Sequence, residues 1–166
     1  MGAHVEAGRL DSELTGTIRP DARSNMHFEY SIEIDASQGR VWEILTDVEA
    51  WPERIETVES VELLTPPPLS RGSQVRLTQP RVPEGVWDIT IWEPPSYFEW
   101  HQESTGANTV AGHRVENLSD HRSRLTLTLE MRGLLVPIFG RMYKDLTNRY
   151  MTLEAQGLRR AAENGP

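Results

Sequence analysis

The sequence has no cysteine among its 166 residues. This absence excludes a disulfide framework, a thiolate nucleophile and a cysteine-ligated metal site. The chain also lacks an apolar run long enough to span a bilayer or to form the core of a secretory signal. We therefore expect no integral membrane segment and a cytoplasmic location.

Positive charge is scarce as well. Lysine and arginine number 17 against 25 aspartate and glutamate residues, which gives a net charge of −8. Nucleic acids and anionic membranes favour basic surfaces, so we expect no nucleic-acid partner. The length suits one domain, over residues 26–163, after a polar, flexible extension at residues 1–25. A monomer and a homodimer are both compatible with these properties.

Most of the chain shows the two-residue alternation of half-buried β-strands. In the first such segment, Phe28, Tyr30, Ile32 and Ile34 alternate with polar residues. The later segments are separated by short turns rich in proline or glycine, which favours an antiparallel meander. They cover residues 58–65, 73–79, 85–92, 97–104, 108–117 and 122–133.

Two regions follow a helical period instead. Residues 37–51 predict a short helix, capped by Asp35 or Ser37 and stopped at Trp51-Pro52, with a further turn after it. Residues 137–162 predict one long amphipathic helix. Its apolar stripe comprises Phe139, Met142, Leu146, Tyr150, Leu153 and Leu158. The order indicates an α+β fold, a curved seven-stranded antiparallel sheet wrapped around a long C-terminal helix, with two short helices after strand 1.

Several stretches resemble a known family. They are "IEIDASQGRVWEILTDVEAWPERI", "GSQVRLTQPRVPEGVWDIT", "PPSYFEWHQES", "GHRVEN" and "NRYMTLEAQGLRR". In these the chain resembles the START-like, or SRPBCC, superfamily of helix-grip proteins, in its bacterial polyketide cyclase/dehydrase and lipid-transport branch.

The resemblance implies a cavity between the sheet and the C-terminal helix, and no cofactor. A first hypothesis is binding of a hydrophobic small molecule, such as a lipid, a quinone or a polyketide-like compound. A second is a cofactor-independent polyketide cyclase, aromatase or dehydratase. A third, a protein-interaction module, would require an apolar patch on the outer sheet face, where we expect polar residues.

Gln79 is the first candidate site residue. Val75 and Leu77 point inward, and alternation places Gln79 on the same face. A buried amide without a partner costs about 1–3 kcal/mol, so Gln79 either bonds the backbone at a sheet bend or orients a ligand.

His113 is the second candidate, because it shares a face with Ala111 and Val115. It can hydrogen-bond a ligand oxygen, or act with Tyr150 as the acid/base pair of an enzyme. A purely structural hydrogen bond is the alternative. His101 is expected to face outward.

Aromatic residues complete the expected ligand site. Trp42 and Trp51 are expected to pack the short helices on the sheet, whereas Arg149 could reach the mouth of the pocket. The predicted ligand-binding residues are Gln79, Trp87, Phe98, Trp100, His113, Tyr143, Leu146 and Tyr150. No metal site is expected, because Glu99, His101 and Glu103 alternate onto the outer face without further ligands.

Overall fold

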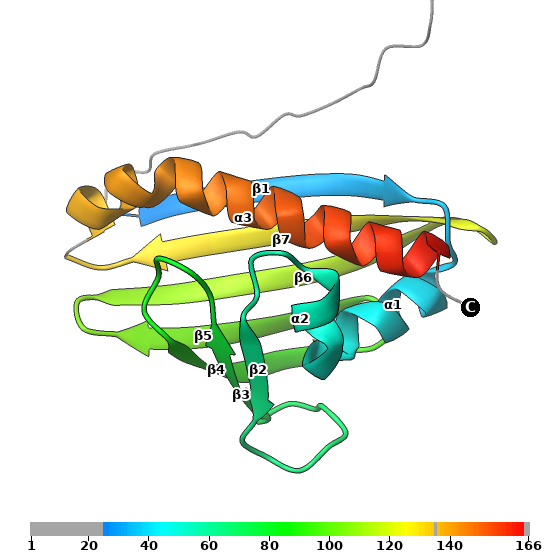
Figure 1. The fold of residues 1–166 in the computed structure, drawn as a ribbon, viewed down its shortest axis with the longest axis horizontal. Helices are drawn as coiled ribbons and strands as arrows, with labels where there is room; N and C mark the ends of the chain where they lie inside the picture. The colour runs from blue at the N-terminus through cyan, green and yellow to red at the C-terminus, as the bar shows by residue number, and fades with distance from the viewer. Residues whose placement is uncertain (1–24, 135, 165–166) are drawn as a thin grey trace, which may run out of the picture.

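The computed structural model describes residues 25–134 and 136–164, without the side chains of residues 139–141. Within those residues, seven strands form one antiparallel sheet in the order β1-β7-β6-β5-β4-β3-β2, and a long helix lies against it (Figure 1). The strands are β1 Asn25–Ile34, β2 Ser60–Leu63, β3 Gln74–Thr78, β4 Gly85–Glu93, β5 Tyr97–Ser104, β6 Ala107–Ser119 and β7 Arg122–Arg132. The helices are α1 Gln38–Thr46, the 3₁₀ turn η1 Val48–Ala50, α2 Trp51–Arg54 and α3 Val136–Asn164. The predicted helix-grip architecture is confirmed.

The first strand pairs with the last. Phe28 lies opposite Leu129 and Glu33 opposite Arg124, in a register that keeps apolar residues on one face. Phe28 and Ile34 are buried, whereas Glu29 and Glu33 are exposed. The alternation of the sequence therefore identifies the two faces of the sheet correctly. Of the proposed flexible extension, Asn25 begins β1 and the rest lies outside the described residues.

A bulge in β4 changes this alternation. The register between β4 and β5 shifts between Ile89 and Ile91. Strict alternation from Trp87 would turn Trp92 outward, but the extra residue returns it to the inner face, where its ring lies 5.9 Å from Phe98. The inner face therefore carries one more tryptophan than strict alternation allows.

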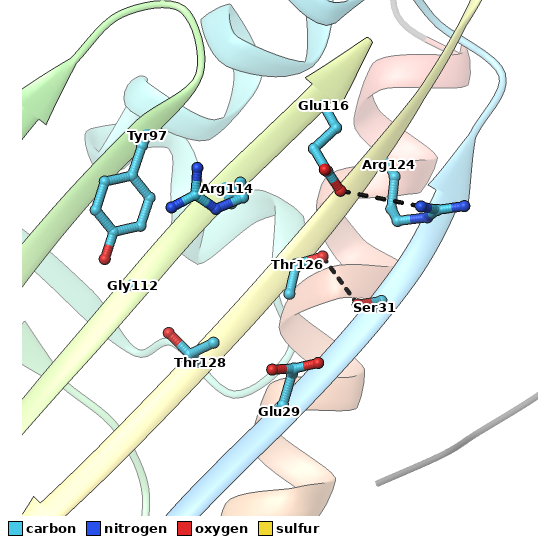
Figure 2. Close-up of a pocket in the computed structure, with 9 residues that line it drawn as sticks. All are labelled: Glu29, Ser31, Tyr97, Gly112, Arg114, Glu116, Arg124, Thr126 and Thr128. Atoms are coloured by element: carbon cyan, nitrogen blue, oxygen red, sulfur yellow. Dashed lines mark hydrogen bonds and ion pairs between the residues drawn. The ribbon is translucent and has the colours of Figure 1, made fainter. Parts of the chain in front are cut away.

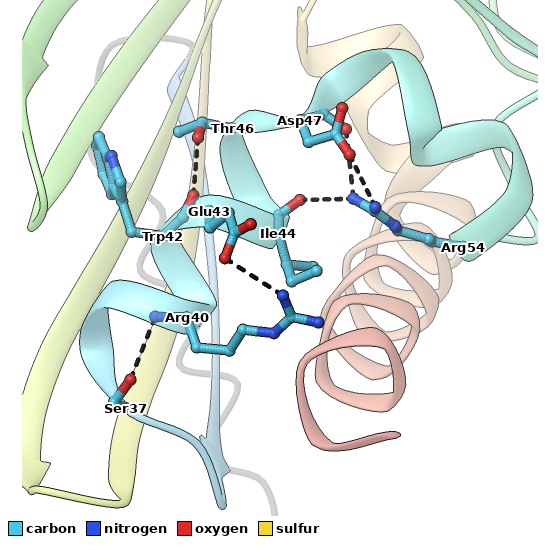
Figure 3. Close-up of polar contacts among 8 residues, drawn as sticks. All are labelled: Ser37, Arg40, Trp42, Glu43, Ile44, Thr46, Asp47 and Arg54. Carbon is cyan, nitrogen blue, oxygen red and sulfur yellow. Dashed lines mark hydrogen bonds and ion pairs between the residues drawn. The ribbon is translucent and has the colours of Figure 1, made fainter. Parts of the chain in front are cut away.

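The short helices close one end of the sheet. The Ser37 side chain caps α1 by accepting from the Arg40 backbone N–H. Arg54 of α2 donates to the Ile44 carbonyl and to the Asp47 carboxylate, which holds α2 against the end of α1 (Figure 3). The expectation that Trp51-Pro52 stops a helix is wrong, because Trp51 begins α2 and the proline fits its first turn.

Helix α3 packs tightly over only part of its length. Its C-terminal half buries Met151, Ala155, Leu158 and Ala162. In the segment before Met151 the apolar residues are less buried: Leu146 is half-buried and Met142 is 64% exposed, whereas Val136 at the start of the helix is buried. The facing row on β7 loosens in the same direction, from buried Leu125 and Leu127 to half-buried Leu129 and Met131. The helix and sheet are thus tightly packed at residues 151–162 and more open around Met142 and Leu146.

Among the residues that the structure describes, no helix combines the length and the apolar composition of a membrane span.

Gly157 allows close packing in the C-terminal half of α3. A Cβ at Gly157 would overlap the Arg54 carbonyl oxygen and lie 3.2 Å from the Ile55 Cα atom. The backbone after α2 therefore approaches α3 as closely as a helix permits, and Gly157 is buried there.

We predict that Gly157→Ala lowers the free energy of unfolding by about 1–2 kcal/mol, although alanine is the better helix former by about 1 kcal/mol. Gly39→Ala in α1 is the matched control, since a Cβ there would meet nothing within 4 Å. The control should be neutral or slightly stabilising. Urea unfolding of both variants measures the difference, and a stabilised Gly157→Ala would refute the close approach.

Candidate active or ligand-binding site

A buried histidine and a carboxylate meet between the sheet and α3. His113 of β6 is 3% exposed, and its Nε2 lies 3.1 Å from Oε1 of Glu154 on α3. An ionised carboxylate only accepts hydrogen bonds, so in this pair the Nε2–H group of His113 donates to the Glu154 carboxylate. This pair links two elements that are 41 residues apart in sequence.

Aromatic rings surround His113. The Phe98 ring stacks on the imidazole at 4.3 Å with an interplanar angle of 9°. The Trp100 ring meets the imidazole edge-on, with the ring centroids 5.3 Å apart. The ring of Trp51, which belongs to α2, lies 6.1 Å from the imidazole. Trp51 is itself fixed, because its indole N–H donates to the Leu45 carbonyl. The ring orientation is therefore set by contacts with three aromatic rings and by the hydrogen bond to Glu154.

The second nitrogen of His113 is unsatisfied. Its Nδ1 is buried and has no hydrogen-bond partner among the described residues. In a neutral ring whose Nε2 bears the proton, Nδ1 is an acceptor. A buried polar atom without a partner costs about 1–3 kcal/mol. This atom is therefore a place where a ligand donor would be stabilised.

Gln79 and Tyr150 lie near the open end of α3. Gln79 falls just beyond β3, is half-buried, and makes no hydrogen bond within the described part of the chain. The backbone carbonyl of the next residue, Pro80, accepts a hydrogen bond from the Tyr150 hydroxyl. The loop after β3 is thereby attached to α3.

The other predicted residues divide by exposure. Trp87 and Trp100 are buried with their rings 5.4 Å apart, whereas Tyr143 and Leu146 are half-buried on α3. Arg149 is exposed, and the side chain of Phe139 lies outside the described residues. The expected packing role of Trp42 is observed, since its ring contacts Trp92 and Phe98.

Sequence reasoning missed Glu154 and underrated Trp51. Glu154 follows Leu146 and Tyr150 at four-residue spacing, so a carboxylate on the apolar helical stripe is the signal that could have found it. Trp51 was assigned to packing alone, yet it also contacts the imidazole.

The outer face of the sheet holds a separate, polar hollow of about 440 Å³ (Figure 2). It lies over Gly112, where a Cβ would come within 2.6 Å of the Thr128 hydroxyl and 2.9 Å of the Tyr97 hydroxyl. Burial and the neighbouring Glu99 carboxylate raise the pKa of Tyr97 to about 12. Arg114 lies over the Tyr97 ring, and Thr126, Thr128 and Ser31 add hydroxyl groups to the lining, so this surface does not suit an apolar ligand. No metal-binding group of three histidine or acidic residues occurs across residues 25–134 and 136–164.

Comparison with known proteins identifies the family. The family model described as "Polyketide cyclase / dehydrase and lipid transport" matches residues 25–163. The chain belongs to this family. No curated protein matches it in sequence.

Several solved structures share its fold. The Zhui aromatase/cyclase from Streptomyces sp. R1128 is 20% identical, with a TM-score of 0.72 over 84% of this chain and 94% of that one. A START superfamily protein from Mycobacterium smegmatis is also 20% identical, with a TM-score of 0.67 over 83% and 97% of the two chains. Norcoclaurine synthase from Thalictrum flavum, in complex with dopamine and hydroxybenzaldehyde, is 12% identical, with a TM-score of 0.69 over 94% and 99%. At these identities the comparison shows the common fold alone.

We predict that Glu154→Ala lowers the free energy of unfolding by about 1–3 kcal/mol, because it leaves the buried Nε2–H of His113 without an acceptor. Glu154→Gln keeps an oxygen acceptor and should cost less. Asp145→Ala, at an exposed position on the same helix, is the control for helix propensity. Equal urea-unfolding midpoints for Glu154→Ala and Asp145→Ala would contradict a stabilising His113–Glu154 bond.

Proposed function

We propose that this family member binds a hydrophobic small molecule between the concave sheet face and α3, with His113 as its polar anchor. The observation that carries the proposal is the buried, unpartnered Nδ1 of His113 beside a wall of aromatic rings. Apolar walls with few oriented polar groups are typical of small-molecule sites.

The loosening of α3 supports a place for the ligand. The half-buried side chains of Tyr143 and Leu146 on the helix face the open end, and Leu129 and Met131 of β7 loosen at that end too. A ligand there would remove partly exposed apolar surface from water, at about 25 cal/mol per Å². The gain in burial and the vacant acceptor at Nδ1 together favour an apolar molecule with a hydroxyl group.

The test compares two probes that differ in one donor. We expect the wild-type protein to bind 1-naphthol about two- to ten-fold more tightly than 1-methoxynaphthalene, as one net hydrogen bond predicts. His113→Phe keeps a ring against Phe98 but removes the acceptor, so the two probes should then bind equally. Dissociation constants come from NMR titration, with the Trp100 indole signal reporting the site.

His101→Phe is the control, because it makes the same replacement on the outer face of β5. It should keep the preference for the hydroxyl probe. Circular dichroism checks that both variants fold. The proposal is refuted if neither probe shifts the Trp100 signal, or if His113→Phe keeps the preference.

One observation favours an enzyme as the second candidate. A carboxylate that orients a histidine and leaves its other nitrogen free is the arrangement of a general base. In a cyclisation, Nδ1 would take a proton from a methylene between two carbonyls. The enolate carbon would bond to a second carbonyl carbon, and the new alkoxide would recover the proton before water leaves. Tyr150 could assist through its oxygen, although its own proton is bonded to Pro80.

This second candidate predicts turnover of a linear poly-β-ketone thioester, followed by chromatography of the products. His113→Phe should abolish cyclisation, and Glu154→Gln should slow it about 10- to 100-fold without abolishing probe binding. Tyr97→Phe on the outer face should turn over normally. Unchanged turnover in His113→Phe would end the catalytic proposal, while binding of 1-naphthol would still stand.

A further inference from the structure

A second hollow, of about 290 Å³ and mostly apolar, lies beside the short helices α1 and η1. It is formed by the end of α1, by η1, by the loop that precedes β3, and by the end of β4. Its apolar surface comes from Val48, Leu63, Pro67, Leu69 and Trp92. The volume is at the small end for ligand pockets, so its occupant would be compact.

Aromatic packing separates this hollow from His113. The half-buried Trp92 ring lines the hollow on one side. Behind it, the Trp42 ring lies at 5.3 Å, and Phe98 contacts both tryptophans at 5.9–6.1 Å. Phe98 in turn stacks on His113. The hollow is therefore separate from the residues around His113, and the Trp92 ring forms part of its wall.

Its rim is acidic, but two of its three carboxylates are neutralised. Arg40 binds Glu43 at 3.2 Å, and Arg54 binds Asp47 at 2.8 Å (Figure 3). Glu49 is the third, and it forms no ion pair or hydrogen bond with any described residue. The unpaired Glu49 carboxylate thus lies beside the apolar floor of the hollow, in a protein whose net charge is −8.

We propose that this hollow binds a small molecule with an apolar ring and a cationic amine. The ring lies against Trp92 and Leu69, while the ammonium group pairs with Glu49 and is attracted by the tryptophan face. A carboxylate in place of the amine is repelled by Glu49. The inference is independent of the function proposed for the His113 site.

The test uses three probes of equal shape and different charge: 2-phenylethylamine, 2-phenylethanol and phenylacetate. In low salt we expect millimolar binding, with the amine about two- to five-fold tighter than the alcohol and phenylacetate the weakest. Two-dimensional NMR follows the Trp92 indole and the backbone amides of Val48 and Glu49. The preference for the amine should fall at high salt, because exposed charges are screened.

Two variants separate charge from shape. Glu49→Gln should make the amine and the alcohol bind equally, whereas Glu103→Gln makes the same charge change at an exposed position on β5, away from the hollow, and should keep the preference. Leu69→Ser should weaken all three probes, since it removes apolar floor from a half-buried loop position.

The inference is overturned if no probe shifts the Trp92 signal, if phenylacetate binds as tightly as the amine, or if Glu49→Gln leaves the preference intact. Shifts confined to the Trp100 indole would assign the amine to the His113 site and would also overturn it. The naphthol comparison reads Trp100 instead, so failure at one site leaves the other result standing.

Discussion

The contact between α3 and the concave sheet face is tight over half of the helix, and the site depends on this asymmetry. Gly157 and Ala155 let the helix approach the sheet and the backbone after α2, where Leu158 is fully buried. Glu154 lies beside this tight segment, while Tyr150, one turn earlier, is already half-buried. The well-packed half thus holds the His113–Glu154 pair in position, and the looser half leaves apolar side chains accessible.

Burying the His113 and Glu154 side chains costs free energy unless their polar groups are hydrogen-bonded, and three features reduce this cost. Glu154 keeps 18% of its side-chain surface exposed, so its charge stays in partial contact with water. His113 makes one strong hydrogen bond and a stacked contact with Phe98. One nitrogen is left unsatisfied. A core selected for stability alone would place an apolar residue here, and this cost supports the functional role that we propose for the pair.

Local periodicity was enough to predict the sheet, the long helix and the inward side of His113, because each depends on residues close in sequence. Local periodicity could not predict contacts between residues far apart in sequence, or the facing of side chains after a bulge. The bulge near Thr90 turns Trp92 to the inner face. The alternation of polar and apolar residues along β4 does not reveal this bulge. Glu154 pairs with a strand 41 residues away. The role of Gln79 stays a prediction, since the strand that would orient it ends at Thr78.

The barrier between solvent and His113 that is easiest to open consists of side chains rather than of paired strands. The Tyr150 hydroxyl bonds the Pro80 carbonyl, which ties the loop between β3 and β4 to the loosely packed half of α3. Separating loop and helix there breaks one side-chain hydrogen bond, a net cost of about 0.5–1.5 kcal/mol, and no strand pairing. Strand opening would instead break several backbone bonds at once. For the binding proposed above, entry past Tyr150 would therefore require less disruption than entry through the sheet.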